Sequence, residues 1–243
     1  MATEKRTRAG TQGPDHGHHH RDVSGGWLRP AVFGAMDGLV TNVSLIAGVG
    51  GGGGSAHTIV LTGLAGLAAG AFSMAAGEYV SVSSQNELVY AEVDKERYEL
   101  ETNAAAEQAE LAGMLRARGV SAATARQAAA EISENPEKAL VMHSMEELGV
   151  NPGELPSPAV AAGASLVSFA AGALVPLLPY LAGLHRLWAA LICAAIAAVA
   201  GGGIVARLTG RPFWRGAVRQ LVLGALAAGL TYLIGTAVGH VTA

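Results

Sequence analysis

The fold of this chain is decided by residues 57–84, which read HTIVLTGLAGLAAGAFSMAAGEYVSVSS. Between Val60 and Gly77 this stretch contains no charged residue. About 20 consecutive apolar residues are enough for an α-helix to cross the roughly 30 Å hydrocarbon core of a bilayer. The stretch therefore predicts a transmembrane helix.

Four further apolar stretches have a similar length, at residues 30–50, 157–183, 187–206 and 213–240. Only 14% of the 243 residues are charged, whereas a soluble domain averages about 25%. The sequence thus predicts an all-α membrane protein with five transmembrane helices; a buried bundle of apolar helices is the alternative. The formal net charge of −3 gives no support for nucleic-acid binding. The single cysteine, Cys193, excludes an intrachain disulfide.

A polar insert at residues 85–156 separates the second apolar stretch from the third. It holds 14 acidic and 6 basic residues and is rich in Ala and Glu, which favour helix. Gly119 and Ser121 mark one helix boundary, and Asn135-Pro136 marks another. We expect three helices in the insert, at about 85–118, 121–133 and 136–148.

The distribution of Lys and Arg predicts the orientation of the chain. Basic residues fall in the N-terminal tail, in the insert and in the link between the fourth and fifth apolar stretches, and only Arg186 falls on the other side. Because cytosolic loops carry the excess of basic residues, the N-terminus and insert are expected in the cytosol and the C-terminus outside.

The sequence also predicts how the chain divides into domains. A disordered, His-containing tail is expected at 1–26, transmembrane helices at 27–84, a cytosolic helical metal-binding domain at 85–156 and further transmembrane helices at 157–243.

Two carboxylates, Asp37 and Glu78, fall inside apolar stretches, roughly 10 Å from the cytosolic end of their predicted helices. Charges inside a bilayer are costly and commonly mark an ion path. Met74 lies one turn from Glu78, and Asn42 adds a polar group to the first helix. These four residues are candidates for a cation path. The alternative is a pair of carboxylates that cap a helix or pair with Arg at the membrane rim.

The insert contains a second set of candidate ligands. On one continuous helix over 85–118, five glutamates fall within an arc of about 80°. Bound divalent cations offset the repulsion within such a stripe; a solvated acidic face is the alternative. Near the end of the insert, thioether, imidazole and carboxylate donors suit Fe²⁺, Mn²⁺ or Zn²⁺, although each side chain alone is also compatible with packing. The candidates are Glu92, Glu96, Glu99, Glu107, Glu110, Met142, His143, Met145 and Glu147.

Three segments resemble the vacuolar iron transporter family: MDGLVTNVSLIAGV (36–49), GAFSMAAGEYVSVSSQNE (70–87) and HSMEELG (143–149). The resemblance implies five transmembrane helices, a homodimer with its pathway at the dimer interface, and a cytosolic metal-binding domain. It also implies movement of Fe²⁺, and often Mn²⁺, out of the cytosol in exchange for protons.

The same resemblance implies roles for single residues. Asp37 and Met74 match the family's pathway residues. Its metal-binding glutamates, spaced 3, 8 and 3, match Glu96, Glu99, Glu107 and Glu110, and Glu147 is the best match among its late ligands. One departure is visible: the paired methionines expected in that loop are spread here as Met142-His143-Ser144-Met145.

The function predicted from these features is proton-coupled export of Fe²⁺, and also Mn²⁺, with Zn²⁺ as a further candidate metal. A membrane-anchored metal sensor or buffer without transport is the alternative, and a transporter of small organic cations is a third hypothesis. No catalytic constellation or P-loop occurs, so neither an enzyme nor a prosthetic group is expected. We expect a homodimer in a bacterial plasma membrane, or in a vacuolar membrane if the source is eukaryotic.

Overall fold

The computed structural model describes residues 26–242 and is helical, with no strand in that range. The first 25 residues, with most of the predicted tail and its histidines, lie outside the described range. The longer elements are α1 (Leu28–Gly51), α2 (Ala56–Thr102), α3 (Ala104–Ala117), α4 (Ala122–Ser133), α5 (Pro136–His143), α6 (Pro158–Leu174), α8 (Leu187–Leu208) and α9 (Phe213–Thr242). Short helical segments fill the links: Ser144–Leu148, Pro152–Glu154, Val175–Leu177 and α7 (Leu178–Leu181).

Five helical segments of the described chain are long and apolar enough to cross a membrane. They coincide with the five apolar stretches, so the prediction of an all-α membrane protein is confirmed. The third candidate span, Pro152–Leu181, is not one regular helix, because α6 gives way to a 3-10 turn that contains Pro176. A proline cannot donate the backbone hydrogen bond that a continuing α-helix needs.

Helix α1 lies at the centre of the apolar bundle and packs against α2, α6, α8 and α9. Its closest neighbour is α6, where a Cβ atom on Gly38 or Gly172 would collide with the backbone of the facing helix. Gly235 of α9 approaches α1 in the same way at Gly48, and Gly239 approaches Gly52 just after the end of α1. Glycine thus lets these backbones come close enough for dense packing within one chain.

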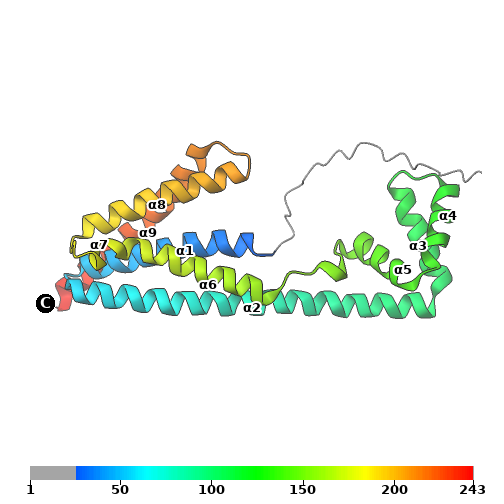
Figure 1. Cartoon of the computed structure of the whole chain (residues 1–243), viewed down its shortest axis with the longest axis horizontal. Helices are drawn as coiled ribbons and strands as arrows, with labels where there is room; N and C mark the ends of the chain where they lie inside the picture. The colour runs from blue at the N-terminus through cyan, green and yellow to red at the C-terminus, as the bar shows by residue number, and fades with distance from the viewer. Residues whose placement is uncertain (1–25, 243) are drawn as a thin grey trace, which may run out of the picture.

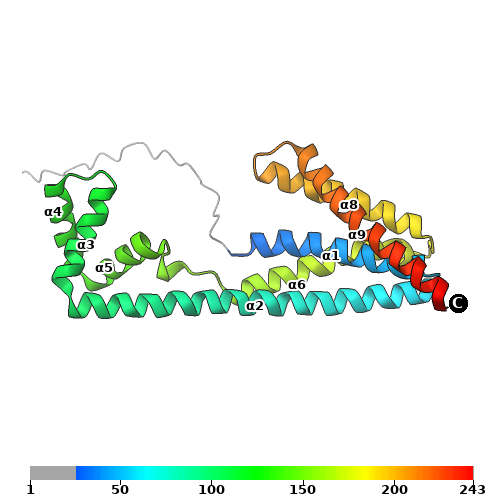
Figure 2. The ribbon, with the colours of Figure 1, turned by 180° about the vertical axis from the view of Figure 1, so that it is seen from behind.

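Helix α2 runs for 47 residues without interruption, from the apolar bundle into the insert. In Figures 1 and 2 it forms one long rod, with the bundle at one end and α3, α4 and α5 at the other. The predicted single helix over 85–118 is wrong, because α2 ends at Thr102 and α3 begins at Ala104. Asn103 leaves helical geometry (φ −128°, ψ 33°) and turns the chain.

The insert has a small apolar core of its own. Leu111 and Ala112 of α3 pack against Ala129 of α4, and Met142 of α5 covers this core. The predicted boundaries are confirmed here: Ser121 caps α4 and Asn135 caps α5, each accepting a hydrogen bond from a backbone N–H of the first turn. This core holds α5 in a fixed position above α2.

Candidate metal centre

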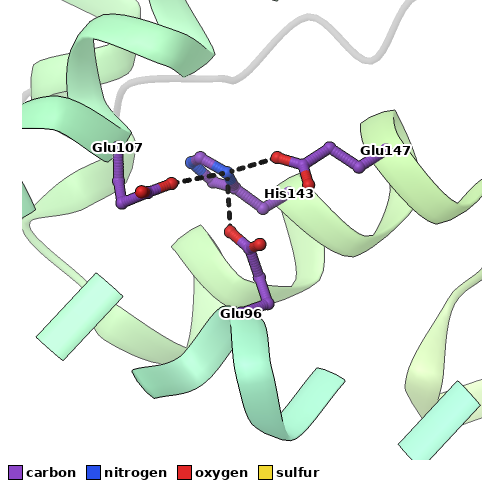
Figure 3. A network of polar contacts seen from close by, with 4 residues as sticks. All are labelled: Glu96, Glu107, His143 and Glu147. Atoms are coloured by element: carbon purple, nitrogen blue, oxygen red, sulfur yellow. Dashed lines mark hydrogen bonds and ion pairs between the residues drawn. The ribbon is translucent and has the colours of Figure 1, made fainter. Parts of the chain in front are cut away.

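Four side chains from four helical segments meet in the insert, as Figure 3 shows. Glu96 comes from α2, Glu107 from α3, His143 from the end of α5 and Glu147 from the π-helical turn Ser144–Leu148. Each offers one ligand atom, and these four atoms all lie within 4.8 Å of one another. No other group of three or more His, Cys, Asp or Glu side chains in residues 26–242 is arranged in this way.

The imidazole of His143 lies at the centre of the cluster. Its Nδ1 atom is 2.9 Å from Oε1 of Glu96, 3.2 Å from Oε1 of Glu147 and 3.8 Å from Oε2 of Glu107. His143 is completely buried, Glu96 and Glu107 are almost so, and Glu147 remains open to solvent. The cluster is therefore a buried pocket of acidic oxygens with one exposed carboxylate at its edge.

Burial changes the acidity of two of these carboxyl groups. Loss of solvation, together with the nearby carboxylate of Glu147, raises the pKa of Glu96 to about 7. Burial also raises the pKa of Glu107, with Glu110 as the next cause. In both cases His143 opposes the rise only in part. A divalent cation among these oxygens favours the ionised carboxylates, since nearby positive charge lowers such pKa values.

The secondary structure explains how residues far apart in sequence converge. The turn at Asn103 folds α3 back, so that Glu107 in its first turn faces Glu96 near the end of α2. The π-helical turn then places Glu147 beside His143. Single π-helical turns are rare and are frequent at functional sites.

Two ion pairs at the surface hold the same segments together. Nε of Arg118, just after α3, lies 2.8 Å from Oε2 of Glu146 in the π-helical turn. Nη1 of Arg97 on α2 lies 2.9 Å from Oε1 of Glu137 on α5. Sequence reasoning did not assign these pairs, because nothing in the linear spacing of their members indicates that they meet.

The other candidate ligands of the insert lie outside this cluster. Glu92 forms an ion pair of 2.6 Å with Lys95, Met142 packs on the core, and Met145 is about half exposed. Glu99 and Glu110 are exposed, yet both are close enough to raise the pKa of Glu107. The continuous stripe is absent because the break at Asn103 puts Glu107 and Glu110 on a different helix from Glu92, Glu96 and Glu99.

The candidate pathway residues lie on α1 and α2. Asp37 is partly buried and accepts a hydrogen bond of 3.4 Å from Oγ1 of Thr41. Asn42 is completely buried and donates to the backbone oxygen of Ala173, at the end of α6 where the last carbonyls lack helical partners. Met74 packs beside the buried Phe169, and Glu78 is partly buried one turn further along α2.

One imidazole nitrogen and several carboxylate oxygens form a ligand set of intermediate hardness. Such a set suits Mn²⁺, Fe²⁺ and Zn²⁺, whereas sites made only of oxygen suit Mg²⁺ and Ca²⁺. The burial of three of the four side chains removes competing water from the ion, and the exposed Glu147 offers a way in. The arrangement is therefore suited to reversible capture of a divalent transition metal.

The sequence matches a family model over residues 28–236, and that model describes the VIT family. The chain belongs to the VIT family. Vacuolar iron transporter homolog 1 of Oryza sativa subsp. japonica is 40% identical over 211 residues, which cover 85% of this chain and 71% of that protein. The vacuolar iron transporter of Acanthamoeba castellanii is 36% identical over 230 residues, covering 90% of this chain and 82% of that protein.

Membership of the VIT family confirms the resemblance noted in the sequence. Vacuolar iron transporter 1 of Oryza sativa subsp. japonica is 30% identical over 233 residues, covering 92% of this chain and 91% of that protein. The relatives thus match both the apolar bundle and the insert. Because the VIT family is a family of transporters, this member is a membrane transport protein and not an enzyme.

Proposed function

We propose that this member of the VIT family exports Fe²⁺, and also Mn²⁺, from the cytosol in exchange for protons. The observation that carries the proposal is the buried group Glu96, Glu107, His143 and Glu147. One member of the group, Glu96, lies on α2, the helix that also runs through the apolar bundle. The nitrogen and oxygen donors of the group are of the kind that binds divalent transition metals. The names of the relatives support iron as the cargo.

In this proposal the insert faces the cytosol and collects the metal. The positions of Lys and Arg support that orientation, with the N-terminus also in the cytosol and the C-terminus outside. Helix α2 carries Glu96 at the insert end and Glu78 and Met74 within the apolar span. From Glu96 to Glu78 is 18 residues, or roughly 27 Å along one helix.

Asp37, Met74 and Glu78 then form the path through the membrane, with Asn42 fixing α1 against α6 beside it. Carboxylates in a medium of low dielectric attract a divalent ion strongly. Protonation of Asp37 or Glu78 on the acidic side weakens that attraction and releases the metal. The proton therefore travels in the opposite direction to the ion.

We further propose a homodimer whose pathway lies between the two copies, in a bacterial plasma membrane or, in a eukaryotic source, a vacuolar membrane. The metals assigned to the protein are the transported Fe²⁺ and Mn²⁺. Zn²⁺ is a further candidate metal for the insert. A sensor or buffer without transport is the competing function, and the experiment below separates the two.

The test is anaerobic Fe²⁺ flux into proteoliposomes under an imposed pH gradient. We expect flux that follows the gradient in the wild type, vanishes in Asp37→Ala and falls strongly in Glu96→Gln. Glu101→Gln is the matched control, because Glu101 is an exposed glutamate of α2 outside the metal cluster. Metal binding without any flux in the wild type would overturn the transport proposal and favour the sensor.

A further inference from the structure

A second cavity lies in the apolar bundle, between α1, α8 and α9, on helix faces that the proposed metal path does not use. Its volume is about 450 Å³. None of the proposed metal-path residues lines it, and its walls are built from Leu, Val, Ala, Gly and one Tyr. Wall residues from the three helices include Leu39, Val43, Leu191, Ala198, Leu221 and Ala228.

The chemistry of these walls defines the kind of occupant. They carry no carboxylate, imidazole or thioether, so the cavity has no ligand for a metal ion. Apolar cavities of about 150 Å³ already stay free of water and take up small apolar molecules. This cavity is larger than that and lies between segments apolar enough to span a membrane. It is therefore suited to hold a hydrocarbon chain.

Three arginines, on α9 and α1, lie past the end of this cavity that is nearer to the insert. On α9 the wall begins at Leu221, and Arg219 and Arg215 precede it by two and six residues. On α1, Arg29 lies 18 residues, or five full helical turns, before the wall residue Ala47, and so on the same face. All three arginines are exposed, and none forms an ion pair with another described residue.

These arginines lack local counter-charges. No Asp or Glu occurs anywhere in the chain after Glu154, so the α8–α9 hairpin contains only basic charges. The guanidinium of Arg215 lies 5.5 Å from the centre of the Trp214 ring. Arg and Trp together at the end of an apolar helix mark the level of the lipid head groups.

We propose that this cavity and the arginines beyond it bind one anionic phospholipid. Its acyl chain fills the space between α1, α8 and α9, and its phosphate pairs with Arg29 of α1 and with Arg215, whose guanidinium lies over Trp214 on the wall side of α9. The charge complementarity decides the class of lipid, because clustered basic residues near a membrane surface attract anionic head groups. In Figures 1 and 2 the turn of the α8–α9 hairpin stands apart from α1. Arg29 and Arg215 are both exposed.

The test is native mass spectrometry of the full chain, purified in detergent and incubated with phosphatidylglycerol or phosphatidylcholine. Two variants fill the cavity: Gly224→Leu and Gly229→Leu. A Cβ atom at Gly224 comes no closer than 3.8 Å to Val40, and one at Gly229 has no neighbour within 4 Å, so neither change strains the backbone packing. Gly163→Leu on α6 is the matched control, since that position also faces open space.

We expect the wild type and Gly163→Leu to retain phosphatidylglycerol selectively, and both cavity variants to lose it. The double variant Arg29→Gln/Arg215→Gln should lower the selectivity by about tenfold or more, because two contacts with an anionic head group disappear. Equal retention of both lipids, or unchanged binding in the cavity variants, would overturn the proposal. A cavity variant that dissociates a dimer without any change in bound lipid would show that a second copy of the chain fills the space instead.

Discussion

At the scale of single residues, His143 decides the character of the candidate metal cluster. Three carboxylates within 4 Å of one imidazole nitrogen would repel one another if they stood alone. His143 offers them a donor in the metal-free protein and a nitrogen ligand when a metal is present. The departure seen in the sequence, two methionines spread to either side of His143 instead of paired, thus falls at the cluster.

The raised pKa of Glu96 predicts how metal binding depends on pH. A metal binds the ionised carboxylate, and the pKa of about 7 means that a proton occupies Glu96 below neutrality. Mn²⁺ affinity, measured by calorimetry on the full chain, should therefore rise as the pH increases through about 7, with release of a proton. Glu96→Gln should flatten this profile, whereas an unchanged profile would show that Glu96 is not the titrating group.

The same pKa has a consequence for stability in the absence of metal. Because the pKa of Glu96 is higher in the folded protein than its ordinary value of 4.5, folding favours the protonated form. Its contribution is complete below pH 4.5 and is lost as the pH rises through about 7. The protection factors for amide hydrogen exchange in α3 and α5, which correct for the intrinsic rise of exchange with pH, should then fall over that range and recover when metal is added.

At the scale of elements, the turn at Asn103 and the π-helical turn after α5 build the cluster. The turn at Asn103 sets the direction of α3, which carries Glu107, and the π-helical turn itself carries Glu147. The ion pair between Arg118 and Glu146 connects the end of α3 to the π-helical turn. This contact is half open to solvent, so its contribution to stability is small, within about 1 kcal/mol.

We predict that Arg118→Gln weakens Mn²⁺ affinity by up to about fivefold while the fold is kept, because the loss of one exposed ion pair corresponds to that factor. Affinity is measured by calorimetry, and helicity by circular dichroism. Arg126→Gln is the matched control, since Arg126 is an exposed arginine of α4 with no ion pair in the described residues. Equal effects of the two substitutions would rule out a positioning role for Arg118.

At the scale of the whole molecule, α2 connects the metal cluster rigidly to the apolar bundle. Its 47 residues correspond to about 70 Å of uninterrupted helix. The link that leads from the insert to α6 is also held to α2, by a hydrogen bond of 2.9 Å from Asn86 to the backbone oxygen of Pro156. Glu96 thus has a fixed position relative to the proposed path residues Asp37, Met74 and Glu78.

A break in this helix should separate binding from transport. Leu88 lies on α2 between the cluster and the bundle, and its side chain is mostly exposed. Leu88→Pro removes one helical hydrogen bond and kinks the helix, at a cost of about 3 kcal/mol. We expect Mn²⁺ binding to the insert to persist and flux into proteoliposomes to fall, with Leu88→Ala as the control that retains both. Full flux in the proline variant would show that the geometry of α2 is not required.

The sequence by itself determined the helical class, the five spans and the boundaries at Ser121 and Asn135, and it named the chemical types of the candidate ligands. These features depend on composition, periodicity and capping, which are local properties. Only the tertiary structure decided which glutamates meet. The prediction of one helix over 85–118 aligned Glu92 to Glu110 on one face, but Thr102-Asn103, two residues of low helix propensity, were the signal of a break.

That break moves Glu107 onto a second helix, and the packing of α3, α4 and α5 brings it back to Glu96 together with His143 and Glu147. Likewise, the glycines of α1, α6 and α9 were visible in the sequence, but their partners were not. Contacts between residues distant in the chain depend on the directions of whole helices. A local pattern therefore fixes each helix, whereas the position of one helix against another is settled only when the core is packed.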